Sequence, residues 1–130
     1  MTNRLLASTA LLLLALPLVA CGSSRDVDVS GEVSAASSVS VDAPIAVQFF
    51  DVLEDEAPAQ VHSISLEAPK SFQAKVALEG DSVLVRAIVD SDGDGACSAG
   101  EAWGEVNATI SDDDTVKVAL ELKAQPCPAE

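Results

Sequence analysis

The sequence predicts an all-β fold, specifically an antiparallel β-sandwich of about seven strands. From Val27 almost to the end of the chain, apolar and polar residues alternate with a period of two, the spacing of strands with one buried face. Three Phe, one Trp and no Tyr leave the core to Val, Leu, Ile and Ala, and abundant Val favours strands. No segment after the first 20 residues has convincing helical periodicity.

The expected strands follow one another at fairly regular spacing. Val27, Val29 and Val33 begin the alternation, and Gly31 interrupts it at a bulge or a close approach of two chains. Segment 45–50 is apolar on both faces, which indicates a central strand. The remaining strands are expected at 61–67, 72–78, 83–89, 106–110 and 116–122.

Turn signals separate these strands. They are the acidic and Pro-containing segment 54–58, the Gly80-Asp81 pair and the Asp112-Asp113-Asp114 run. Seven short strands joined in this way are typical of a sandwich of immunoglobulin-like or transthyretin-like type. Segment 27–130 has the length of one such domain.

Residues 1–20 have the three parts of an export signal. A positive start, Met1 to Arg4, precedes an apolar run at 5–16 that is shorter than the ~20 residues of a membrane-spanning helix. The sequence Leu18-Val19-Ala20-Cys21 resembles the lipobox of bacterial lipoproteins. An ordinary secretory signal with an incidental Cys at the junction is the alternative.

The lipoprotein resemblance implies cleavage before Cys21 and acylation of that residue, which would anchor the mature chain to a lipid bilayer. Segment 21–26 would then be the lipidated Cys and a short tether. Gly22 and Ser23 follow the Cys with no Asp beside it, and in this family that resembles an outer-membrane address more than an inner-membrane one. The expected location is the cell envelope, either periplasmic or surface-exposed.

The exported segment is strongly acidic. All 21 acidic residues follow Cys21, and only six of the seven basic residues do, so its net charge is −15. Such a surface repels nucleic acid and anionic lipid headgroups, and it favours cations or basic partners. The simpler alternative is a solvated acidic surface with no specific partner.

Segment 90–101 has the spacing of a calcium-binding loop. Acidic residues stand at loop positions 1, 3, 5 and 12, and Gly95 stands at position 6, where the chain must turn sharply. The expected ligands are the side chains or carbonyls of Asp90, Asp92, Asp94, Ala96, Ser98 and Glu101. Without a cation the four carboxylates would repel one another, so the empty loop is expected to be disordered or partly protonated.

Two features favour a structural Ca²⁺ ion over a calcium sensor. The loop lies between expected strands rather than between two helices, so there is no helix pair to open. Position 8, usually an apolar aliphatic residue, is Cys97. The alternative is an ion-free loop in which Asp and Gly merely make successive turns.

Two further resemblances concern the mature chain. Segment 83–104, with Val85-Arg86-Ala87, Gly93-Asp94-Gly95 and Gly100-Glu101, resembles bacterial transthyretin-like and adhesin B-type sandwich domains, which implies a β-sandwich and a binding or structural role. Segment 45–59 is similar to YbaY-type envelope lipoproteins, which are thought to act beside secretion machinery.

Cys97 and Cys127 are the cysteines that remain if Cys21 carries lipid, and in an oxidising compartment they are expected to form a disulfide. Two unpaired thiols are the alternative. A zinc site is disfavoured because two Cys and one distant His supply too few ligands.

The sequence gives little support for an enzyme. His62 is the single histidine and no acidic residue is placed near it by local spacing, so a hydrolase using His62 is the weaker alternative. We expect a monomeric, calcium-stabilised, membrane-anchored lipoprotein that binds or supports an envelope or surface partner. The second reading is an accessory factor in envelope or secretion-system assembly, which would need an exposed apolar patch or a free strand edge.

Overall fold

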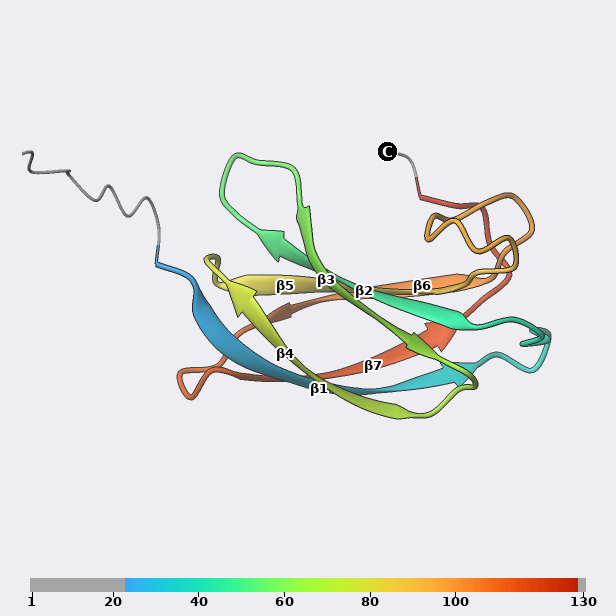
Figure 1. Cartoon of the computed structure of the whole chain (residues 1–130), viewed down its shortest axis with the longest axis horizontal. Helices are drawn as coiled ribbons and strands as arrows, with labels where there is room; N and C mark the ends of the chain where they lie inside the picture. Colours follow the sequence, from blue (N-terminus) through green and yellow to red (C-terminus); the bar gives the residue numbers. More distant parts are fainter. Residues whose placement is uncertain (1–22, 129–130) are drawn as a thin grey trace, which may run out of the picture.

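The alternating pattern becomes seven β-strands within residues 23–128, the part of the chain that the computed structural model describes (Figure 1). The strands are β1 (Arg25–Ala35), β2 (Ile45–Val52), β3 (Ala59–Leu66), β4 (Ser71–Leu78), β5 (Ser82–Val89), β6 (Trp103–Thr109) and β7 (Thr115–Leu122). No helix in this part of the chain is long and apolar enough to cross a membrane. The predicted lipobox and Cys21 lie outside the described residues.

The strands form two sheets, which confirms the predicted β-sandwich. One sheet has three strands in the order β4-β1-β7, and the other has four in the order β3-β2-β5-β6. The pairs are antiparallel except β1 with β7, which runs parallel from Asp28↔Thr115 to Ala35↔Leu122. β1 and β7 are far apart in the sequence, so no tight turn joins them and forces an antiparallel arrangement.

The core lies between the sheets and consists of the inward residues of each strand. Val27, Phe49 and Val85 have no exposed surface, as expected for alternate positions on facing sheets. Burying one such side chain contributes roughly 1.5–3 kcal/mol relative to leaving it in water. The predicted central strand at 45–50 is β2, which lies between β3 and β5.

At Gly31, β1 lies close to side chains of both neighbouring strands, which is one of the two roles predicted for this glycine. A Cβ atom at this position would lie 2.6 Å from Val118 Cγ2 and 2.7 Å from Phe72 Cζ. Phe72 belongs to β4 and Val118 to β7, so both neighbours of β1 close over the glycine. The alternation therefore breaks at Gly31 because no side chain has room there.

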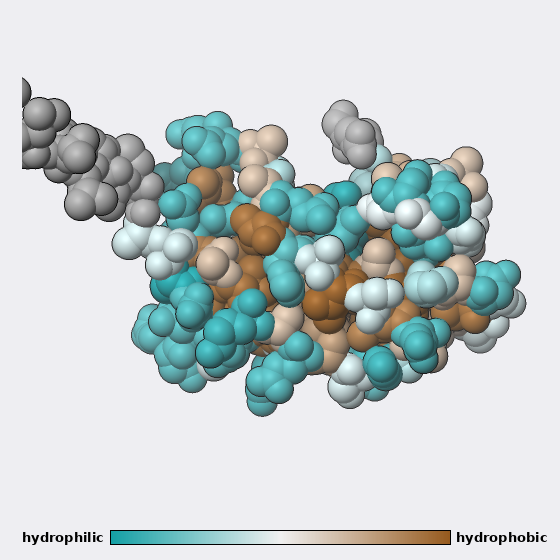
Figure 2. All heavy atoms as spheres, in the orientation of Figure 1, coloured by the Kyte–Doolittle hydropathy of each residue, from teal (hydrophilic) through white to brown (hydrophobic). Residues whose placement is uncertain are grey.

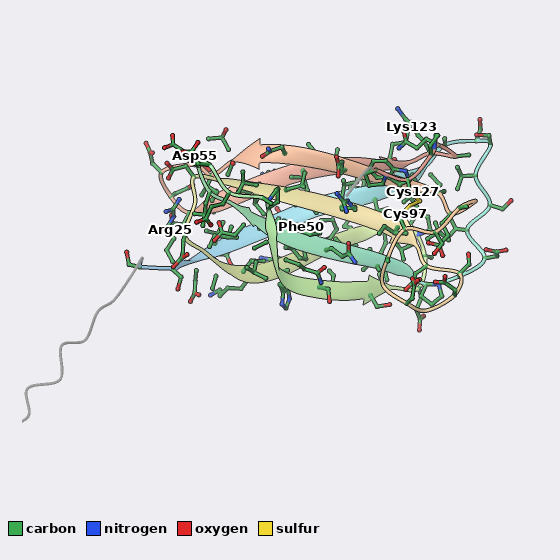
Figure 3. All side chains as sticks on the ribbon, turned by 90° about the horizontal axis from the view of Figure 1, so that it is seen from above. Arg25, Phe50, Asp55, Cys97, Lys123 and Cys127 are labelled. Atoms are coloured by element: carbon green, nitrogen blue, oxygen red, sulfur yellow. A yellow bond between two sulfur atoms is a disulfide. The ribbon has the colours of Figure 1, made fainter. Side chains whose placement is uncertain are left out.

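The two ends of the sandwich carry different features. At one end, where β1 begins, Arg25 pairs with Asp114 at 2.9 Å and with Asp81 at 3.6 Å, which joins two turns to the start of the strand. Cys97 and Cys127 lie at the other end (Figure 3). The 90–101 segment is therefore far from the point where the described chain begins.

Candidate metal centre

The loop between β5 and β6 contains the predicted calcium-binding segment. β5 ends at Val89 and β6 begins at Trp103, so the segment is flanked by strands, as the sequence indicates. Gly93, Gly95 and Gly100 have φ values of 75°, 72° and 90°, a region that favours glycine. Gly95, at loop position 6, therefore provides the sharp turn expected there.

Four carboxylates converge within this loop. Ligand oxygens of Asp90, Asp92, Asp94 and Glu101 all lie within 4.8 Å of one another. Glu101 is buried with 6% of its surface exposed, whereas Asp92 and Asp94 are exposed. The cluster therefore extends from the protein interior to solvent.

Backbone amides hold each carboxylate in place. Asp90 accepts hydrogen bonds from the Gly93 amide at 3.1 Å and the Gly95 amide at 2.9 Å. Glu101 accepts one from the Ser91 amide at 3.2 Å and one from the Ser98 amide at 3.0 Å. Asp90 is the first residue of the segment and Glu101 the last, so these hydrogen bonds bring the two ends of the loop together.

Hydrogen bonding also stabilises the charged form of Asp92. The Asp94 side chain, then the Asp94 amide and the Ser98 hydroxyl, lower the pKa of Asp92 from 3.8 to about 2. The Ser98 hydroxyl donates to Asp92 Oδ2 at 2.9 Å, so Ser98 lies beside the cluster. Asp92 is therefore ionised at neutral pH.

Ala96 lies in the same turn, and its amide donates to Asp94 Oδ1 at 2.9 Å. All six predicted ligand residues thus belong to one hydrogen-bonded loop. The side-chain donors are carboxylate and hydroxyl oxygens, the hard ligands that suit Ca²⁺. Within residues 23–128 the ion pairs involve Arg25, Arg86 and Lys123, and none reaches these acids.

Contacts from two distant segments fix the position of the loop. Cys97 forms the expected disulfide with Cys127, with an S–S distance of 2.03 Å and a Cα–Cα distance of 5.7 Å. Gln48 of β2 donates a side-chain hydrogen bond to the Gly95 carbonyl. Sequence reasoning missed Gln48, although a Gln within the apolar run 45–50 was a detectable signal.

Trp103 and the C-terminal segment cover the outer face of the four-stranded sheet beside the loop. The Trp103 indole donates to the Pro126 carbonyl at 2.9 Å, and the Gln125 side chain donates to the Trp103 carbonyl at 2.9 Å. Arg86 lies 5.8 Å from the Trp103 ring centre and 5.1 Å from that of Phe50. The segment that leads to Cys127 is therefore held against Trp103 directly before the disulfide.

His62 lies on β3 at the edge of the four-stranded sheet, and it is exposed. Its ring centre is 5.6 Å from that of Phe49. Among residues 23–128 no hydrogen bond or ion pair of the imidazole is found.

Comparisons with known proteins give one structural likeness. An alternative pilotin from the type II secretion system of Vibrio cholerae superposes with a TM-score of 0.48 and 16% identity, covering 75% of this chain and 96% of the pilotin chain. No protein-family model and no curated protein matches the sequence.

Proposed function

We propose that the protein is a membrane-anchored envelope lipoprotein whose β-sandwich is stabilised by Ca²⁺ and serves a binding or structural role. The convergence of four carboxylates within 4.8 Å carries the calcium assignment. Asp90, Asp92, Asp94 and Glu101 would supply carboxylate oxygens. The Ala96 carbonyl and Ser98, directly or through water, would complete the shell.

Charge supports a cation at this point. Four carboxylates in mutual contact range repel one another, and in residues 23–128 no Arg or Lys ion pair offsets them. A divalent ion would remove two of the four negative charges. Ca²⁺ fits better than Mg²⁺, which retains several waters and demands near-octahedral geometry.

The surroundings favour a structural ion. Strands flank the loop on both sides, and the Cys97–Cys127 disulfide and Gln48 restrain it. A loop held in this way has little freedom to open, so ion binding would act mainly by stabilising the folded state.

The anchor would place the loop away from the bilayer. Arg25 and Asp55 lie at one end of the sandwich, and Cys97 and Cys127 lie at the other (Figure 3). Cys21 is four residues before Arg25, a reach of at most ~14 Å. An acylated Cys21 would hold the Arg25 end near the membrane, outer rather than inner, while the calcium loop faces a partner in the periplasm or at the surface.

Calorimetric titration of Ca²⁺ into the metal-free protein tests the ion site. We expect stoichiometric binding and a higher melting temperature, since Ca²⁺ at 100 times its Kd stabilises the folded state by ~2.7 kcal/mol. The variant Asp90→Ala/Asp94→Ala should lose both effects. The control Glu56→Ala/Asp112→Ala makes the same charge change at exposed positions outside the loop and should retain them.

If Ca²⁺ leaves the melting temperature of the native chain unchanged, or if both double variants respond alike, the calcium assignment is wrong. A second candidate function is an accessory role in envelope or secretion-system assembly. The free edge of β3 is the observation that favours it.

A further inference from the structure

β3 is an edge strand whose outer side has no neighbouring strand in the described sheet. It pairs with β2 alone, and all five residues from Ala59 to Ser63 are exposed. Val61 is 43% exposed, the most accessible large apolar side chain in residues 23–128. Unpaired backbone groups along such an edge can bind another strand.

The other three edge strands carry the features that usually prevent such pairing. β4 has Lys75, β6 has Glu105, and β7 has Lys117 and Glu121. β6 and β7 also protect each other through paired hydrogen bonds of 3.1 Å between Trp103 and Lys123. β3, with the sequence AQVHSISL, contains no Lys, Arg, Asp, Glu or Pro.

An apolar seam borders this edge. β3 and β4 belong to different sheets, and no backbone ladder joins them in the described structure. Both strands lie in the foreground of Figure 1, and Figure 2 shows apolar atoms between them. Ile64 of β3 is half-buried against the core, so apolar side chains of an added strand would continue the core outward.

Charge indicates which partner fits. The turn before β3 contains Glu54, Asp55 and Glu56, and Glu67 follows its last residue. A neutral strand with acidic groups at both ends suits a segment with basic ends, and it disfavours a second copy of this chain, whose net charge is −14.

We propose that the free edge of β3 binds an extended segment of a partner protein, which becomes the fifth strand of the four-stranded sheet. The segment would have alternating apolar residues and basic residues at its ends. The regular part of the β3 ladder, His62 to Leu66, offers the pairing edge. Val61 lies directly beside it, as the extra residue of a bulge in β3 opposite Phe49 and Phe50 of β2. This inference rests on the proposed binding role but not on the calcium ion.

A labelled peptide of about ten residues, with Val and Thr alternating between two Lys at each end, tests the proposal on the full chain in neutral detergent. We expect saturable binding by fluorescence anisotropy, and slower amide hydrogen exchange confined to β3 and its neighbours. Replacing the terminal Lys residues with Glu should weaken binding at least about tenfold.

The variant Val61→Glu separates strand addition from general attraction to an acidic protein. It removes an apolar contact and adds a negative charge, so it should weaken binding about tenfold if the peptide pairs with β3, but strengthen it if attraction alone acts. Gln73→Glu makes the same charge change on the edge strand β4 and should alter affinity less than about twofold.

The proposal is wrong if millimolar peptide does not bind, if protection appears away from β3 and its neighbours, or if Val61→Glu binds the peptide more strongly. Self-association that Val61→Glu abolishes would overturn it too, because the occupant would then be a second copy. Titrations with Ca²⁺ and with a chelator separate the two proposals. If the peptide binds β3 but the chain binds no Ca²⁺, the calcium proposal is wrong and the proposal for β3 stands.

Discussion

At the scale of single residues, the Asp51 carboxylate organises the turn between β4 and β5. It is 6% exposed and accepts hydrogen bonds from the amides of Glu79 and Gly80, both at 2.9 Å. Gly80 itself has no room for a Cβ, which would meet the Val52 carbonyl. Sequence reasoning missed Asp51, because nothing in the local pattern shows that a carboxylate on β2 reaches a turn 28 residues away.

Asp51→Ala should therefore lower the free energy of unfolding by about 1–3 kcal/mol, since it leaves two amides, one of them buried, without acceptors. Urea unfolding measures this loss. Asp112→Ala, at an exposed position in the turn between β6 and β7, is the control and should stay within about 0.5 kcal/mol of the native chain. Equal stability of the two variants would contradict the structural role of Asp51.

The lowered pKa of Asp92 predicts that the stability of the metal-free protein depends on pH. Its pKa is lowered from 3.8 to about 2, mainly by hydrogen bonding to Asp94, so its contribution to stability is complete above 3.8 and is lost as pH falls through 2. Melting temperatures in chelator should decrease over this window. Asp92→Asn should show a smaller decrease. Asp113, whose pKa Thr115 and Ser111 also lower, still titrates in the variant.

At the scale of elements, the disulfide connects the calcium loop to the segment after β7. Cys97 occupies loop position 8, and Cys127 Sγ lies 3.2 Å from the carbonyl oxygen of Ser98, a proposed ligand residue. The Trp103 and Gln125 hydrogen bonds hold the same segment on β6. The loop is thus fixed in a position that its own sequence could not impose.

Breaking the disulfide should weaken Ca²⁺ binding several-fold, because the ion must then order a looser loop. Calorimetry of the oxidised chain and of Cys97→Ser/Cys127→Ser measures the difference. The bridge spans 30 residues and should contribute roughly 3–4 kcal/mol to metal-free stability. By reciprocity, Ca²⁺ should lower the fraction of disulfide reduced at equilibrium in a dithiol buffer. Identical affinities in the two chains would show that loop and bridge are independent.

At the scale of the whole molecule, the sandwich separates its two ends. The turns near Arg25 would face the bilayer if Cys21 is acylated, and the loop and disulfide would face outward (Figure 3). The free edge of β3 runs between these ends. The lipid anchor at Cys21, the free edge of β3 and the calcium loop would therefore act without obstructing one another.

The anchor predicts that Cys21→Ser moves the protein from the membrane fraction to the supernatant. Two or more acyl chains give stable attachment, whereas none leaves an acidic protein that anionic headgroups repel. Incorporation of labelled palmitate, followed by fractionation, measures both effects. Ser23→Ala keeps Cys21 and serves as the control. Membrane retention of an unlabelled Cys21→Ser chain would contradict lipid anchoring.

Local pattern was enough for several features because they depend on neighbouring residues. The period of two predicted the strands, and β2 was recognised as central because 45–50 is apolar on both faces. Gly31 was identified from the interruption of that period. The spacing of Asp90, Asp92, Asp94 and Glu101 indicated one loop that gathers four carboxylates, and these side chains do lie together.

Tertiary structure alone decided the features that join distant segments. The parallel pairing of β1 with β7, the reach of Gln48 to Gly95 and the burial of Asp51 all depend on how strands far apart in sequence are stacked. The same holds for β3: its sequence lacks charged residues, but only the order of the strands shows that it lies at an edge. Alternation specifies which face of a strand is buried, but the order of strands in a sheet arises from packing of the whole core.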